Sequence, residues 1–104
     1  MAELRSALAG MPRVVKHRIG AFDDTDLAQL LRACGADHIL VAGLITRGAV
    51  LSTVCRAADL DYRVTVLSDG CFDPEPSVRE ALLRHVLPIR ARVLAGSAIS
   101  RDDL

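Results

Sequence analysis

The stretch that decides the fold is His38-Ile39-Leu40-Val41-Ala42-Gly43-Leu44, and the polar segment Thr46-Arg47-Gly48 comes shortly after it. A continuous apolar run of this length is typical of a strand in a parallel sheet, where helices cover both faces. We therefore predict that residues 38–44 form a strand near the middle of such a sheet.

Helix and strand patterns alternate on both sides of this strand. An apolar stripe over residues 27–34 predicts a helix, with Asp24 or Thr25 as its cap and Gly35 at its end. The elements predicted after the strand are a helix over residues 48–58, a strand over 62–67 that Ser68-Asp69-Gly70 ends, a helix from Pro76 to Pro88, and a strand over 91–95. Residues 13–18 are a weaker strand candidate. The alternation predicts one α/β domain over residues 1–104, a Rossmann-like parallel sheet with flanking helices whose last three strands lie side by side.

The composition argues against nucleic acid, membrane and metal partners. The 104 residues carry thirteen basic and thirteen acidic side chains, so no net charge attracts phosphate backbones or anionic lipid. No apolar run is long enough to span a bilayer, and the first residues lack the pattern of a secretory signal, which favours a cytoplasmic protein. The three cysteines, Cys34, Cys55 and Cys71, match no metal or redox spacing. We expect no metal or cofactor, and we interpret Cys34 and Cys55 as small apolar residues of helices.

Ligands of open α/β sheets bind beyond the carboxyl ends of the strands. Two segments hold that position in this sequence, residues 44–49 and residues 68–73. The candidate ligand-binding residues are Leu44, Ile45, Thr46, Arg47, Gly48 and Asp69.

Four blocks of the sequence, in order, carry a resemblance to a known family. Residues 14–22, 25–27, 41–53 and 64–73 resemble successive blocks of the isochorismatase-like hydrolases, which are cysteine hydrolases. The resemblance implies the family's six-stranded parallel sheet between helices, of which this chain corresponds to the C-terminal part and is incomplete on the N-terminal side. It also implies that the peptide bond between Leu44 and Ile45 is cis.

The family's hydrolases use an Asp, a Lys and a Cys, and the resemblance carries only the lysine over to this chain. Lys16 stands in the block of the catalytic lysine, whereas the aspartate belongs to an N-terminal region that this sequence does not contain. Ala49 occupies the position of the nucleophilic cysteine, and a methyl group cannot attack a carbonyl or an imine. The helix start at Gly48 and Ala49 should still favour anions, because its N–H groups and dipole remain. Arg79 stands where the family commonly has a histidine.

Each remaining candidate side chain has a functional and a structural interpretation. Cys71 lies on a strand-end segment, yet the family has small residues there that are not nucleophiles. Lys16, His17 and Arg47 could form a cationic rim around the former pocket, and the alternative is solvated surface charge. We interpret His38 and His85 as helix-end or surface residues, because nothing near them in the sequence supplies a partner.

The predicted strand at residues 39–44 has a consequence for assembly. In the family the first strand flanks it, and in this sequence only Val14-Val15 could replace that neighbour. An apolar strand at a sheet edge exposes backbone hydrogen-bonding groups, which folded proteins normally cover. We therefore predict self-association, as a homodimer or as a hetero-oligomer with a full-length relative.

Three interpretations of function stay open. The first is a catalytically degenerate domain, repurposed in small-molecule metabolism either for subunit assembly or for binding a small molecule, with a small anion among the candidate ligands. The second is an enzyme with altered chemistry that acts on a small amide, imine or vinyl ether through Lys16, Asp69 or Cys71. The third is a fragment with no independent role. Whether the chain is an enzyme is therefore left open at this point.

Overall fold

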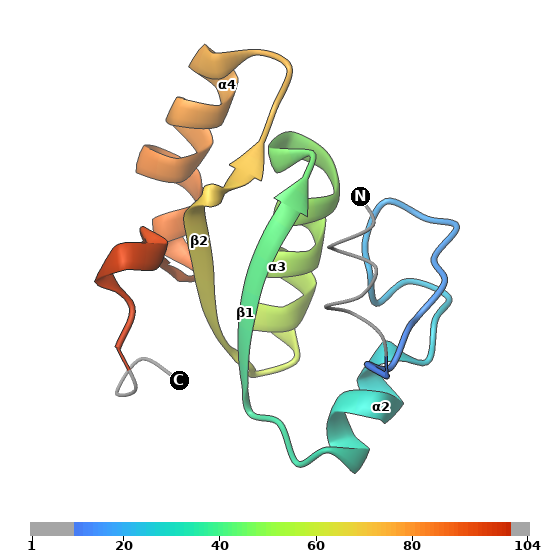
Figure 1. Cartoon of the computed structure of the whole chain (residues 1–104). Coiled ribbons are helices and arrows are strands. Elements are labelled where there is room, and N and C mark those ends of the chain that lie inside the picture. The colour runs from blue at the N-terminus through green and yellow to red at the C-terminus, as the bar shows by residue number, and fades with distance from the viewer. Residues whose placement is uncertain (1–9, 101–104) are drawn as a thin grey trace.

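The structure is a computed structural model that describes residues 10–100 (Figure 1). Among these residues, three parallel strands form one sheet in the order β1-β2-β3, with β1 at His38–Leu44, β2 at Arg63–Phe72 and β3 at Arg92–Leu94. The α-helices are α2 at Leu27–Ala33, α3 at Leu51–Asp59 and α4 at Pro76–Ala81. Further helical turns cover Thr46–Val50 before α3, Leu82–Val86 and Leu87–Ile89 after α4, and Gly96–Ala98. The predicted α/β fold, with its last three strands side by side, is confirmed.

Strand β1 lies at the edge of this sheet and not near its middle, so that part of the prediction is wrong. Only β2 pairs with it among the described residues. Its side chains alternate: Val41 is 8% exposed on the core face, whereas Leu44 is 68% exposed. Residues 13–18 form no strand, so nothing within residues 10–100 pairs with its outer edge. An apolar run predicts burial of both faces but does not say which segment provides the cover.

Strand β2 runs through Ser68-Asp69-Gly70, where the sequence predicts a break. The pairing with β1 goes from Val41↔Val66 to Gly43↔Cys71, so the strand bulges here and resumes its pairing. A bulge leaves residues unpaired without ending a strand. The polar and flexible residues that predicted a turn therefore belong to the bulge.

Arg79 of α4 holds this bulge in place. Its Nε donates a hydrogen bond to the carbonyl of Cys71 at 2.8 Å, and its Nη2 donates to the carbonyl of Ser68. A guanidinium is suited to two acceptors at once, because its donors are fixed in one plane. Arg79 thus provides hydrogen-bond donors to carbonyls at both ends of the bulge, where β2 does not pair with β1.

Two helices extend beyond their predicted limits. The helix predicted from Gly48 begins at Thr46 with a π-helical turn, in which the Val50 N–H donates to the Ile45 carbonyl at 3.3 Å. The last helix passes Pro88 and ends at Ile89 in a 3-10 turn. Proline lacks the N–H that would continue an α-helix, but it fits the first positions of a new turn.

The core lies on one face of the sheet, between the sheet and the helices that follow β1 and β2. Its buried members are Val41, Val64 and Val66 from the strands, Val50, Val54 and Ala57 from the α3 segment, and Cys71, Leu83 and Leu87. Helix α2 buries none of its residues and lies away from the sheet (Figure 1). Its predicted position is confirmed, with Cys34 at the C-terminal cap and Gly35 in the left-handed region at φ 69°.

Candidate functional site

A pocket of about 190 Å³ lies between the carboxyl end of β1 and the start of the α3 segment. Its lining residues are Lys16, Ala21, Val41, Ala42, Gly43, Leu44, Ala49, Val50 and Thr53. The structure therefore brings Lys16, Ala49 and Leu44 together, although Lys16 and Ala49 are far apart in the sequence. Apart from Lys16 and Thr53, the side chains of this lining are apolar or absent.

Lys16 stands on the rim of this pocket and is held by its own loop. Its Nζ donates to the carbonyls of Arg18 at 2.9 Å and Ile19 at 3.2 Å. These bonds use two of the three ammonium donors and leave one for a ligand. The loop itself is tied to α3, because the Ala21 N–H donates to the Thr53 hydroxyl at 3.1 Å.

Ala49 contributes only a methyl group to the pocket, from within the π-helical turn that precedes α3. The cis peptide between Leu44 and Ile45, which the family resemblance implied, is present just before this turn. The Gly48 N–H donates back to the Ile45 carbonyl at 3.0 Å. Because this N–H already donates within the chain, it is not available to a bound anion. The helix start at Gly48 and Ala49 therefore offers fewer free donors than expected.

Asp73 is a site residue that the sequence analysis did not single out. Its carboxylate is fully buried, and it accepts hydrogen bonds from the N–H groups of Arg47 at 3.3 Å and Glu75 at 3.0 Å. The Arg47 guanidinium lies 3.3 Å from the same carboxylate and 3.6 Å from Glu75. Asp73 thereby joins the segment after β2 to the helix start beside Ala49. The bond from Asp73 to the amide two residues later is an Asx turn, and Asp73-Pro74-Glu75-Pro76 could have indicated it.

The cationic rim that Lys16, His17 and Arg47 could have formed is not present in the pocket lining. Arg47 is committed to Asp73, and neither Arg47 nor His17 lines the pocket. The alternative for Arg47 was a solvated surface charge. The structure shows an ion pair with the buried carboxylate of Asp73 instead. Lys16 is the cation of the pocket lining.

The second predicted segment does not reach this pocket. Asp69 accepts a hydrogen bond from the Gly96 N–H at 2.9 Å, and Cys71 is buried with its Sγ donating to the Leu67 carbonyl at 3.2 Å. Burial raises the pKa of the Cys71 thiol, with a smaller opposing effect from a backbone hydrogen bond at Gly43 and from Arg79. A thiol with a raised pKa is a poor nucleophile at neutral pH.

The other predicted ligand residues around the helix start also lie outside the pocket lining. Leu44 lines the pocket, whereas Ile45, Thr46, Arg47 and Gly48 do not. The Thr46 hydroxyl is buried and finds no hydrogen-bond partner within the described part of the chain. Such a group carries a desolvation cost without a compensating bond.

The remaining cysteines and histidines are not part of this pocket. Cys34 is exposed at the C-terminal cap of α2, and Cys55 is half-buried within α3. His38 places Nε2 2.8 Å from the Thr65 hydroxyl, so it does have a partner, at the start of β1. No group of three His, Cys, Asp or Glu side chains within residues 10–100 could hold a metal ion. No helix in the same range is long and apolar enough to cross a membrane.

Comparisons with known proteins agree on one family. The model of the isochorismatase domain matches residues 1–97. An uncharacterized isochorismatase family protein of Escherichia coli O157:H7, YecD, is 32% identical over 80 residues, which are 77% of this chain and 43% of that protein. A probable inactive nicotinamidase of Arabidopsis thaliana, At3g16190, is 34% identical over 70 residues, which are 66% of this chain and 36% of that protein.

Solved structures show the same likeness. An isochorismatase family protein of Burkholderia thailandensis superposes with a TM-score of 0.81 at 32% identity, over 88% of this chain and 50% of that chain. One from Desulfovibrio vulgaris gives a TM-score of 0.82 at 31% identity, over 86% of this chain and 47% of that chain. The chain thus spans about half the length, or less, of each of these four relatives.

Proposed function

The chain belongs to the isochorismatase family, and from this premise we propose that it is a catalytically degenerate member that binds a small molecule in the Lys16–Ala49 pocket. The observation that carries the proposal is Ala49. Its methyl group faces the pocket at the position where the family resemblance expects a nucleophilic cysteine. A methyl group has no lone pair, so no acyl or imidoyl intermediate can form on it.

The pocket that remains suits a small, mostly apolar ligand with one polar or anionic group. Its volume of about 190 Å³ is below the range of about 300–1,000 Å³ typical of drug-sized sites. The free donor of Lys16 supplies one charge-assisted hydrogen bond at the rim. The Arabidopsis relative is described as a probable inactive nicotinamidase. This description supports the idea that members of the family can lose activity.

The alternative, an enzyme with altered chemistry, would need Lys16, Asp69 or Cys71 to act on substrate. Cys71 is buried as a thiol, and Asp69 already accepts from the Gly96 amide. Neither of the two lines the pocket with Lys16. The positions of these groups therefore favour binding over catalysis.

The test is a hydrolysis assay of the purified chain on small amides, imines and vinyl ethers, with Lys16→Ala and Cys71→Ser as variants. We expect no turnover above the uncatalysed rate. We also expect a small carboxylic acid or amide to bind the wild-type chain, with weaker binding in Lys16→Ala and unchanged binding in Cys71→Ser. Turnover by the wild-type chain that disappears in either variant would contradict the proposal.

We also propose that another polypeptide covers the outer edge of β1, as a homodimer or as a complex with a full-length relative. Leu40, Leu44 and Ile45 are 41%, 68% and 40% exposed along this edge, and Phe72 is 55% exposed beside it. Apolar exposure next to an unpaired strand favours association. Light scattering of the purified chain at micromolar concentration tests the homodimer, and a monomer would refute that arrangement.

We propose a cytoplasmic location as well. One relative, the isochorismatase effector Isc1 of Verticillium dahliae, is described as secreted, so location differs within the family. Fractionation of the producing cells, with antibody detection of the chain, decides between a cytoplasmic and a secreted location.

A further inference from the structure

A second pocket, of about 350 Å³, opens at the amino ends of the three strands, away from the carboxyl end of β1 where Ala49 lies. Its lining residues are His38, Arg63, Val64, Thr65, Pro88, Ile89, Arg90, Ala91 and Arg92. Its volume falls within the range of small-molecule sites. It shares no lining residue with the Lys16–Ala49 pocket, so a ligand here would bind independently of the proposed function.

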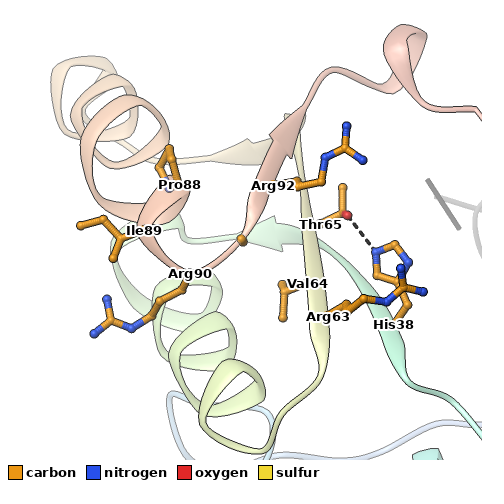
Figure 2. Close-up of a pocket in the computed structure, with 9 residues that line it drawn as sticks. His38, Arg63, Val64, Thr65, Pro88, Ile89, Arg90 and Arg92 are labelled. Carbon is orange, nitrogen blue, oxygen red and sulfur yellow. Dashed lines mark hydrogen bonds between the residues drawn. The ribbon is translucent and has the colours of Figure 1, made fainter. Parts of the chain in front are cut away.

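The register of the sheet builds one wall of this pocket. His38 of β1 pairs with Arg63 of β2, and Thr65 of β2 pairs with Arg92 of β3. Residues two apart on a strand share a face, so these four side chains start from one face of the sheet. Figure 2 shows these four side chains on one side of strand β2 and residues 88–90 on its other side.

The charge of this lining is of one sign. Three arginines and one histidine line the pocket, and none of its nine residues is acidic. Arg63 lies 4.0 Å from Asp37, but both side chains are largely exposed, at 68% and 89%, so this ion pair contributes little. The lining of this pocket therefore contains more basic side chains than the lining around Lys16 does.

A buried hydroxyl orients the histidine within the wall. Thr65 is 0% exposed, and its hydroxyl lies 2.8 Å from Nε2 of His38 (Figure 2). Because this contact engages Nε2, Nδ1 is the ring nitrogen that remains for a ligand. The imidazole is thus held next to Arg63, its neighbour across the sheet, by a hydroxyl group that solvent does not reach.

We propose that this pocket binds the phosphate group of a small phosphorylated ligand, between Arg63 and Arg92 and beside His38. Guanidinium groups hold phosphate by paired N–H donors in a planar geometry. A competing explanation is that the arginines only balance the carboxyl ends of α3 and of the Leu87–Ile89 turn, where helix dipoles are negative. That role needs no ligand and predicts no saturable binding.

The test is a titration of the full chain with inorganic phosphate at constant ionic strength, followed by calorimetry and by amide shifts in NMR spectra. The variants are Arg63→Gln and Arg92→Gln, and Arg84→Gln is the matched control, because Arg84 is an exposed arginine outside the pocket. We expect saturable binding that weakens about tenfold in each pocket variant, the loss of one charge-assisted hydrogen bond. The control should bind within twofold of wild type.

Two results would overturn the proposal. One is the absence of saturable binding, which would leave the arginines as partners of the helix ends. The other is an equal weakening in Arg84→Gln, which would show that phosphate responds to the overall charge and not to this pocket. Circular dichroism of each variant checks whether the fold is retained. Because Arg63 and Arg92 are replaced separately, each variant tests the site on its own.

Discussion

The replacement of Asp73 by alanine should be the most destabilising single change near the Lys16–Ala49 pocket. The buried carboxylate accepts from the Arg47 and Glu75 amides and pairs with the Arg47 guanidinium. Its removal leaves two amides without an acceptor and a half-exposed guanidinium without its carboxylate. A buried group left unpaired costs about 1–3 kcal/mol, and breaking a buried ion pair costs about 3–5 kcal/mol.

These effects overlap, because Arg47 is 43% exposed and can turn to water. We therefore expect Asp73→Ala to lower the free energy of unfolding by about 3 kcal/mol, below the full sum of its contacts. Asp73→Asn keeps one acceptor oxygen and should lose about half as much. Urea unfolding monitored by circular dichroism measures each change as a shift in the midpoint. The dependence of the unfolding free energy on urea concentration, the m-value, should stay the same.

Glu75→Gln is the matched control for this prediction. Glu75 lies 3.6 Å from the Arg47 guanidinium, but its side chain is 62% exposed. An exposed pair of this kind contributes about 0–1 kcal/mol. If Asp73→Ala cost no more than Glu75→Gln, the carboxylate would not be the tie between the end of β2 and the start of the α3 segment, and the reasoning would be refuted.

Three further changes test other parts of the site. Arg79→Met should cost about 2 kcal/mol in urea unfolding, because the two bulge carbonyls of β2 lose a charged donor, and a cost near zero would show that water replaces it. Thr46→Val should leave stability unchanged or raise it by about 1 kcal/mol in the same assay, because the buried hydroxyl has no partner among the described residues; a loss above 1 kcal/mol would reveal one. At pH 8 iodoacetamide should modify Cys34 well before Cys71, as peptide mass spectrometry of timed samples would show, because burial keeps Cys71 a thiol; equal rates would contradict this.

Local patterns predicted the order of the elements well, and failed where contacts distant in sequence decide the outcome. The α2 stripe and the strand at residues 92–94 follow from side-chain spacing and turn residues alone. The continuation of β2 through residues 68–70 depends on Arg79, which lies on the next helix. No periodicity within β2 carries that information, so the bulge looked like a turn.

The candidate site shows the same division between what is local and what is not. Ala49 and Lys16 were found from the blocks of residues that resemble the family, and the pocket brings both together. For Arg47 the sequence left a cationic rim and solvated surface charge as alternatives, because it shows the charge of the side chain but not the carboxylate that neutralises it. Asp73 lies 26 residues further along the chain and faces the same helix start only because β1 and β2 are parallel neighbours.

The same parallel arrangement explains why the two pockets differ in charge. At the carboxyl ends of the strands, Arg47 forms an ion pair with the buried Asp73 and does not line the pocket. The remaining lining is mostly apolar and contains one cation, Lys16. At the amino ends, the register places His38 beside Arg63 and Thr65 beside Arg92, and no acidic side chain joins them in the lining. A net charge of zero over the whole chain is therefore compatible with one pocket whose lining has a single lysine and another whose lining has three arginines and a histidine. An anion bound by this protein should accordingly be sought first at the amino ends of the sheet, away from the position that lost its nucleophile.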